Sequence, residues 1–313
     1  MKHQNLVCAL LYVAALLLFA TVPGGAESPQ KVTVSLRPYK GTRSVVAVKV
    51  NGAGPYDFLV DTGATVTVLD TKLFHQLGLR ADGAFRVTSS AGVTSQTRSV
   101  VEEIALNCLS VRNITVVSMK SPMPGSDYAA VRGILGENFL RHFDILFDNR
   151  HRRITLDAGD SLADSLAGER LPIAFPPLPQ GDENGYQPMI SVKVQAYGQA
   201  RLLLDSGATS LALLQPRIEW TGLGDRITLI TVNGSLICEE TDATLYLGKG
   251  TIRNLEIVNC QTVTVQPWDA EGILPTAIFK QIFISHAGSY AIINPIQSGN
   301  VPREVAAVAP LPQ

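Results

Sequence analysis

The second half of this chain repeats the first, and the duplication constrains the fold more than any other feature of the 313 residues. Four blocks recur in the same order, at an offset that falls only from 144 residues (205 − 61) to 139 (272 − 133). Such a drift is what loop deletions on a shared scaffold would give. The matched blocks are 46–50 with 190–194, 58–65 with 202–209, 111–114 with 252–255, and 133–135 with 272–274.

Each copy has the pattern of a β structure. The side chains of Val45–Val50 show an alternating pattern, and the segment is rich in β-branched residues. A turn at Asn51–Pro55 follows it. Small polar turns near residues 89–93 and 231–235 lie between strand-like segments and predict a β-hairpin in each copy. Short helices are expected after the segment 134–140 and over 276–281. The sequence therefore predicts an all-β protein with two related lobes.

The repeat carries a polar tetrapeptide, Asp-Thr-Gly-Ala at 61–64 and Asp-Ser-Gly-Ala at 205–208. One such tripeptide alone is typical of an Asx turn at the end of a strand. Here both copies follow a short apolar run, at matched positions of a duplicated unit, which favours a shared site. Gly63 and Gly207 suit a tight loop that another chain segment approaches closely.

Two facing carboxylates define a specific chemistry. At a separation of a few ångströms they cannot both ionise cheaply, so they share one proton. The ionised partner takes a proton from a water molecule, and the protonated partner hydrogen-bonds the scissile carbonyl and then donates its proton to the leaving amine. This chemistry requires no metal and no covalent intermediate.

From about Thr42 to Pro295 the chain resembles the pepsin and retropepsin superfamily of aspartic peptidases. The resemblance rests on the paired tetrapeptides and on a hydrophobic-hydrophobic-Gly element about 70 residues later, here Ile134-Leu135-Gly136. Ala64 and Ala208 after the glycines are closer to the retroviral type, whereas two lobes in one chain is the pepsin arrangement. The resemblance implies two homologous β-barrel-like lobes with a cleft between them.

The resemblance also implies roles for individual residues. Asp61 and Asp205 would form the catalytic dyad, and Thr62 and Ser206 would cross-brace the lobes through hydroxyl-to-backbone hydrogen bonds. Gly63 and Gly207 would support the dyad, and hairpins near Gly92 and Gly234 would close over an extended peptide. The positions concerned are Asp61, Thr62, Gly63, Asp205, Ser206, Gly207, Gly92 and Gly234.

Two features depart from the family pattern, and the alanines after the two glycines bear on the pH of activity. Pro275 stands where the second copy should have glycine, and proline lacks an N–H, so packing beside the Asp205 loop is expected to differ. Neither hairpin tip has a tyrosine of the pepsin-like type. Ala64 and Ala208 lack the hydroxyl that would stabilise a carboxylate, which predicts an activity optimum in mild rather than strong acid.

The N-terminal segment has the pattern of an export signal. Lys2 and His3 precede an apolar stretch, and Gly24, Gly25 and Ala26 follow at the place of a cleavage site. The dense apolar part is short for a membrane span of about 20 residues, so a cleaved signal is favoured, with an uncleaved anchor as the alternative. We expect a signal peptide at 1–26, lobes at 27–157 and 188–297, a linker at 158–187 with a possible edge strand at 171–175, and a flexible tail at 298–313.

The composition limits the classes of molecule that the protein is expected to bind. Hydrophobic residues make up 46% of the chain and charged residues 17%, with a net charge of −1. This balance argues against nucleic acid as the main partner. No metal-binding or phosphate-binding motif is present, so neither metal nor cofactor is expected. Cys108, Cys238 and Cys260 allow either one disulfide, Cys238–Cys260 being the local choice, or three free thiols.

Two functions are compatible with these features. The first is a secreted or periplasmic aspartic endopeptidase, acting as a monomer on polypeptide substrates. The alternative is a catalytically inactive two-lobed protein of the same fold that binds extended peptides. Pro275 and the plain hairpins favour the alternative, and the intact aspartates and glycines favour the peptidase.

Overall fold

The structure of this protein is a computed structural model that describes residues 30–39, 43–120, 130–176, 186–214, 224–231, 233–261 and 270–297. The segments 1–26 and 298–313, for which a signal peptide and a tail are expected, lie outside the described residues. No helix in the described part of the chain is long and apolar enough to cross a membrane. The predicted all-β class is confirmed, since the described residues form mostly strands and the helices between them are short.

The first lobe is an eight-stranded sheet in the order β2-β3-β4-β9-β5-β8-β7-β6, in which β3 also pairs with β7. Two short helices follow strands of this sheet, α1 after β5 and α2 after β9. The elements are β2 (Arg37–Tyr39), β3 (Arg43–Val50), β4 (Ala53–Val60), β5 (Thr67–Asp70), α1 (Thr71–Gln76), β6 (Gly83–Ser89), β7 (Gly92–Leu106), β8 (Leu109–Met119), β9 (Val131–Leu135) and α2 (Glu137–Leu140).

The second lobe repeats the order of the seven strands from β3 to β6. Its order is β14-β15-β20-β16-β19-β18-β17, with β14 also paired to β18. The parallel pairs β4–β9 and β5–β8 recur as β15–β20 and β16–β19. The elements are β14 (Met189–Val194), β15 (Gly198–Asp205), β16 (Leu211–Leu214), β17 (Arg226–Thr231), β18 (Gly234–Leu247), β19 (Gly250–Cys260), β20 (Gly272–Pro275) and the 3₁₀ helix η2 (Thr276–Ile278).

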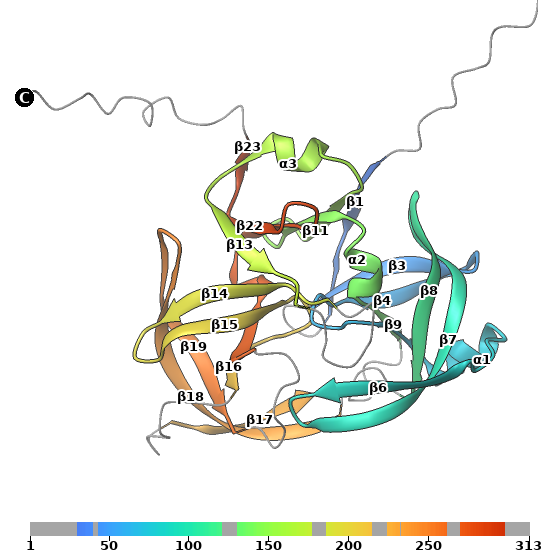
Figure 1. Ribbon diagram of the computed structural model, residues 1–313, viewed down its shortest axis with the longest axis horizontal. Helices are drawn as coiled ribbons and strands as arrows, with labels where there is room; N and C mark the ends of the chain where they lie inside the picture. The colour runs from blue at the N-terminus through green and yellow to red at the C-terminus, as the bar shows by residue number, and fades with distance from the viewer. Residues whose placement is uncertain are drawn as a thin grey trace, which may run out of the picture.

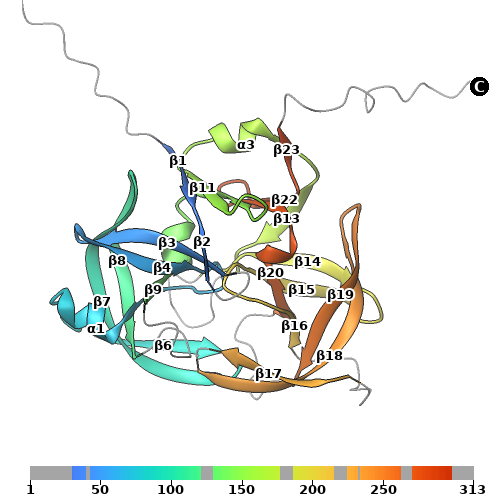
Figure 2. The same cartoon turned by 180° about the vertical axis from the view of Figure 1, so that it is seen from behind.

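A set of strands drawn from both halves joins the lobes, and we call it the bridging sheet. Its order is β1-β11-β10-β21-β22-β13, and β13 continues into the second lobe by pairing with β14. It lies at the top of Figures 1 and 2, above the two lobes. Its strands are β1 (Lys31–Ser35), β10 (Asp144–Asp148), β11 (Arg153–Asp157), β13 (Arg170–Ala174), β21 (Gln281–Ser285) and β22 (Tyr290–Ile293).

The centre of the bridging sheet is the pair β10–β21. Ile145 lies opposite Ile284 and Phe147 opposite Ile282, so the two hairpins β10–β11 and β21–β22 meet in a two-fold register. These side chains belong to one buried apolar cluster that continues into both lobes. Burial of one continuous core favours a fixed arrangement of the lobes.

The described part of the segment between the two copies, residues 158–176 and 186–187, contains regular elements. The helix α3 (Ser161–Ser165) is followed by β12 (Leu166–Ala167), which pairs with β23 (Ile296–Gln297). β13 covers the place of the expected edge strand, but it is paired on both sides, with β22 and β14. An internal strand in this segment has no local signal beyond the alternation of Leu171 and Ile173, both of which are buried.

The cysteines, which the sequence left undecided, divide into a pair and a single thiol. Cys238 and Cys260 face each other directly in the β18–β19 ladder and form a disulfide. Cys108 is an exposed free thiol. The bridge fastens the base of the β17–β18 hairpin to the second lobe.

Candidate active site

The two Asp-Thr/Ser-Gly loops begin where β4 and β15 end. β4 runs parallel to β9, and β15 parallel to β20, so both loops leave their sheets in the same way. The backbone N–H of Asp61 donates to the carbonyl of Leu135 at 3.1 Å. The apolar strands therefore deliver the aspartates to fixed positions, as the sequence pattern predicted.

Each aspartate is oriented by its own loop. Asp61 Oδ1 accepts the backbone N–H groups of Gly63 and Ala64 at 2.9 and 3.1 Å. Asp205 Oδ1 accepts those of Gly207 and Ala208 at 2.7 and 3.0 Å. Two backbone donors on one oxygen leave the other carboxyl oxygen of each residue for a different partner.

The structure brings the two aspartates together. The side chains of Asp61 and Asp205 are hydrogen-bonded to each other. Each carboxylate also lies against the glycine of the opposite loop, and a Cβ at Gly207 would be 2.6 Å from Asp61 Oδ2. Only a residue without a side chain fits there, which explains why both loops need glycine.

Thr62 and Ser206 connect the loops in a reciprocal arrangement. The Thr62 hydroxyl donates to the carbonyl of Leu204 at 2.7 Å, and it accepts the N–H of Ser206 at 3.0 Å. The Ser206 hydroxyl donates to the carbonyl of Val60 at 2.9 Å and accepts the N–H of Thr62 at 3.1 Å. Both residues are buried, so these four hydrogen bonds are shielded from water.

Residues 46–139 match the family model described as aspartyl protease. The match places the chain in the retropepsin/pepsin-like aspartyl protease group. The matched residues are the first copy of the repeat, and the second copy has the same strand order and the same loop. The family supports a peptidase hydrolase. No curated protein matches the chain.

The electrostatics of the paired loops distinguish Asp205 from an ordinary surface aspartate. Burial raises the pKa of Asp205 well above 3.8, and the neighbouring Asp61 raises it further. The N–H groups of Gly207 and Ala208 oppose this rise, but they do not cancel it. Asp205 therefore keeps a proton at a pH where an exposed aspartate would have lost it.

The helix α2 supports the Asp61 loop from behind. The N–H of Glu137 donates to the carbonyl of Ala64 at 2.7 Å. Asn138 Oδ1 accepts both the N–H and the hydroxyl of Thr67, at 2.9 and 2.8 Å. The Thr67 hydroxyl in turn accepts the N–H of Gly136 at 3.2 Å. The sequence flagged Gly136 by its motif, but it gave no role to Thr67 or Asn138.

The corresponding place in the second copy is apolar. By the offsets of the repeat, Leu211 stands where the first copy has Thr67, Ala277 where it has Asn138, and Pro275 where it has Gly136. The N–H that Pro275 lacks would have no hydroxyl to meet, because Leu211 has none. The packing beside the Asp205 loop therefore differs from that beside the Asp61 loop. All three positions change together, from residues that hydrogen-bond one another to apolar residues.

The two predicted hairpins meet at their tips. They are β6–β7 and β17–β18, with Gly92 and Gly234 at positive φ of 154° and 151°. The amide of Asn233 donates to the carbonyls of Val87 and Gly92, both at 3.0 Å. Figures 1 and 2 both show β6 and β17 approaching each other from opposite lobes.

Two further contacts join the hairpin tips. The Thr94 hydroxyl donates to Asn233 Oδ1 at 2.9 Å, and the hydroxyls of Ser89 and Thr231 are 3.3 Å apart. The Asn-Gly dipeptide at 233–234 signalled a hairpin turn, but a single sequence has no signal for the partner of the asparagine side chain.

Gln187 also contacts the Asp61 loop, and the sequence did not indicate it. Its side-chain amide donates to the carbonyl of Gly63. The residue is buried, and its Oε1 has no hydrogen-bond partner among the described residues. It lies within the range 158–187 that the sequence assigns to the linker.

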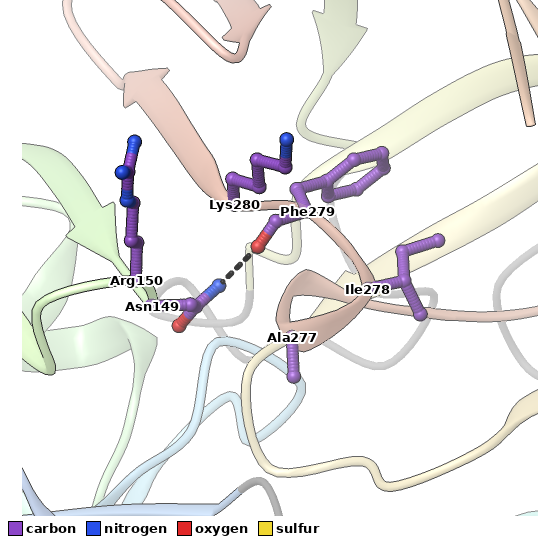
Figure 3. A pocket seen from close by; sticks show the side chains of 6 residues that line it. All are labelled: Asn149, Arg150, Ala277, Ile278, Phe279 and Lys280. Atoms are coloured by element: carbon purple, nitrogen blue, oxygen red, sulfur yellow. Dashed lines mark hydrogen bonds between the residues drawn. The ribbon is translucent and has the colours of Figure 1, made fainter.

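A separate cavity of about 530 Å³ lies beside η2 and contains no residue of either aspartate loop. Figure 3 shows its side chains pointing in different directions, with Arg150 and Lys280 extending one way and Ala277 another. The lining residues are Asn149, Arg150, Ala277, Ile278, Phe279 and Lys280. No group of three or more His, Cys, Asp or Glu side chains that would hold a metal occurs in the described ranges.

Proposed function

We propose that this chain is an exported aspartic endopeptidase that hydrolyses peptide bonds in extended polypeptides, with Asp61 and Asp205 as the catalytic dyad. One observation carries the proposal: the two carboxyl groups are hydrogen-bonded to each other, and each is fixed by two backbone N–H groups. Buried carboxyl pairs are costly to hold together, so their retention favours a catalytic role over a purely structural one.

The chemistry follows from the one proton that the pair shares. Asp205, whose pKa is raised by burial and by Asp61, holds the shared proton, and Asp61 is the ionised partner. A water molecule between them gives a proton to Asp61, and its oxygen attacks the carbonyl carbon while Asp205 hydrogen-bonds the carbonyl oxygen. Asp205 then donates its proton to the amide nitrogen, the C–N bond breaks, and the proton taken from water stays on Asp61 as the shared proton.

The substrate class follows from the hairpins. Their tips, including Gly92 and Gly234, belong to strands with backbone groups that pair best with an extended segment. An unfolded or looped polypeptide supplies such a segment, whereas a folded surface does not. We propose that a cleft between the lobes receives it beneath the hairpins.

Export is supported by two independent features. Residues 1–26 have the charge and hydropathy pattern of a signal. The Cys238–Cys260 disulfide is of a kind that persists in oxidising compartments. We therefore propose a secreted or periplasmic monomer, since one chain already supplies both aspartate loops.

The test is cleavage of denatured casein by the purified protein between pH 3 and 7, beside Asp61→Asn and Asp205→Asn. The proposal expects both substitutions and a statine-type inhibitor to abolish cleavage. Cleavage that survives either substitution would overturn the dyad assignment. No cleavage at any pH, with the inhibitor still bound, would instead support the inactive peptide-binding protein.

A further inference from the structure

A buried acid–base pair lies behind the Asp61 loop and plays no part in the mechanism above. Glu137 Oε2 and His286 Nε2 are 3.0 Å apart, and the side chains are 0% and 6% exposed. Glu137 belongs to α2 of the first lobe, whereas His286 lies in the turn between β21 and β22 of the bridging sheet. The pair therefore joins segments from opposite halves of the repeat.

The hydrogen bonds of His286 fix how many protons the pair holds. Its Nδ1 is 2.7 Å from the carbonyl of Phe143, which only accepts, so Nδ1 carries a hydrogen. The contact between Nε2 and Glu137 Oε2 then requires one proton between them, either on the imidazole or on the carboxyl. Without that proton two acceptors would face each other in a buried place.

Glu137 connects this proton to the dyad through two hydrogen bonds. Its backbone N–H donates to the carbonyl of Ala64 at 2.7 Å, and the N–H of Ala64 donates to Asp61 Oδ1 at 3.1 Å. The next residue, Asn138, donates its N–H to the carbonyl of Thr65 at 3.2 Å. Any displacement of Glu137 is therefore transmitted to the carboxylate of Asp61.

The other half of the molecule has the same contact without charge. Asn149, 137 residues before His286 (286 − 149), occupies the equivalent turn between β10 and β11. Its amide donates to the carbonyls of Thr276 and Phe279 in and beside η2, both at 2.9 Å, and Figure 3 shows the hydrogen bond to Phe279. A neutral amide thus suffices to join a bridging hairpin to a lobe. A buried titratable pair gives no better stability than neutral groups, so its presence beside Asp61 calls for another role.

We propose that Glu137 and His286 are positioning residues for Asp61, which hold the Asp61 loop in place through a single proton shared across the lobe boundary. This inference rests on the proposed peptidase function, because it assigns a role within that active site. When the proton is lost, Glu137 keeps its charge without a partner, and the Asp61 loop loses its rear support.

The charged and titratable surroundings favour retention of the proton to above pH 6.5. Burial raises the pKa of Glu137, and Asp61 adds to the rise, while His286 and Arg141 oppose it. Burial lowers the pKa of His286, but Glu137, Phe143 and Asp144 outweigh it, so the net direction is upward from 6.5. His142 lies nearby with a lowered pKa, from burial and then from Arg141 and His286, and the Phe175 ring is 5.2 Å from that of His286.

The raised pKa of His286 determines how support of the Asp61 loop depends on pH. A histidine whose pKa is raised in the folded state contributes stability below its unfolded pKa, and it loses that contribution as pH rises through its folded pKa. Support of the Asp61 loop is therefore complete in the acid range and is lost on the alkaline side of 6.5.

The test uses His286→Gln, Glu137→Gln, the double variant and Asn149→Ala as the matched neutral control. His286→Gln removes the shared proton and leaves the buried charge of Glu137 without a cation, so we expect kcat to fall about tenfold or more with KM within about twofold. The double variant removes both titratable groups and should recover most of that loss. Asn149→Ala should leave kcat and the shape of the pH profile within about twofold of the wild type. A double variant no better than His286→Gln would overturn the proposal.

A second measurement on the full chain does not depend on catalysis. In an NMR titration, His286 should titrate above 6.5 in the wild type and below it in Glu137→Gln, and the Ala64 amide signal should follow the wild-type titration. An unchanged His286 titration in Glu137→Gln, or an Ala64 signal that ignores it, would refute the pair's role. If the wild type cleaves nothing while these signals behave as expected, the peptidase proposal fails and the coupling of the pair to the loop stands.

Discussion

The carboxylate of Asp205 lies against Gly63 of the opposite loop, so closely that a Cβ at position 63 would be 2.5 Å from Asp205 Oδ2. The reverse contact, between Gly207 and Asp61, has the same character. Each lobe therefore supplies one aspartate and the glycine that makes room for the other aspartate. Neither copy of the repeat forms this site alone.

Gly63→Ala should displace Asp205 while leaving both aspartates in the chain. The added methyl group forces an overpacked contact that costs about 1–3 kcal/mol of stability. We expect cleavage to fall about 100-fold or more, since small displacements of reacting groups have effects of this size. Gly250→Ala is the control, because its nearest contact is 3.2 Å away at the carbonyl of Leu247. Cleavage by Gly63→Ala within about threefold of the wild type would show that the contact is unimportant.

The pH dependence of activity should reflect the raised pKa of Asp205. Because burial and Asp61 keep Asp205 protonated above 3.8, the singly protonated dyad persists as pH rises from strong to mild acid. We expect kcat/KM to be greatest in mild acid, which agrees with the absence of a hydroxyl at Ala64 and Ala208. An optimum below about pH 3, under the ordinary aspartate pKa of about 3.9, would contradict this explanation.

The same shift predicts a pH dependence of the free energy of unfolding. A carboxyl group whose pKa is raised on folding contributes stability below its unfolded value, and loses that contribution as pH rises through its folded pKa. The wild type should therefore lose more stability than Asp205→Asn as pH rises from 3.8. Thermal unfolding of both proteins from pH 3 to 8 measures the difference. Parallel curves would mean that Asp205 has an ordinary pKa in the folded protein.

Much of the fold was predictable because local sequence patterns indicate it, and these patterns occur twice in the chain. Alternation in Val45–Val50 indicated a strand, and the repeated apolar run and tetrapeptide indicated equivalent loops around Asp61 and Asp205. The hairpins were also predicted from their turn residues, and η2 lies within the expected range 276–281, whereas α2 lies inside the segment 134–140 and not after it.

The contacts between the halves were not predictable, because they depend on how two copies pack in space. Ile145 pairs with Ile284 across the bridging sheet, and nothing in either strand specifies the other. The same holds for Glu137 with His286 and for Asn233 with Val87. In the sequence alone, Glu137, His286 and Asn233 are equally compatible with a solvated surface. Their partners become apparent only when the two lobes are placed together.

Pro275→Gly should not improve catalysis, although it restores the glycine of the family pattern. Pro275 has φ −63°, which suits proline, and Leu211 offers no acceptor for a new N–H. We expect stability to fall by about 0.4–1 kcal/mol through the unfolded chain, with cleavage within about twofold of the wild type. The matched change Gly136→Pro should be far more damaging, because Gly136 donates to Thr67 and a Cβ there would meet Val66 at 2.7 Å. A gain of more than about fivefold in cleavage by Pro275→Gly would show that the proline impairs the site.

Asn233→Asp should loosen the joined hairpin tips. The carboxylate has no hydrogens to donate to the carbonyls of Val87 and Gly92, and it places charge beside both oxygens. Each lost hydrogen bond contributes about 0.5–1.5 kcal/mol, so amide hydrogen exchange in residues 87–94 should accelerate about tenfold or more. Asn254→Asp on β19 is the control, since it makes the same chemical change at an exposed asparagine away from the hairpin tips. Equal exchange in the two variants would mean that Asn233 does not hold the tips together. Faster exchange in Asn233→Asp alone, with a changed KM for casein, would indicate that the tips separate to admit the substrate.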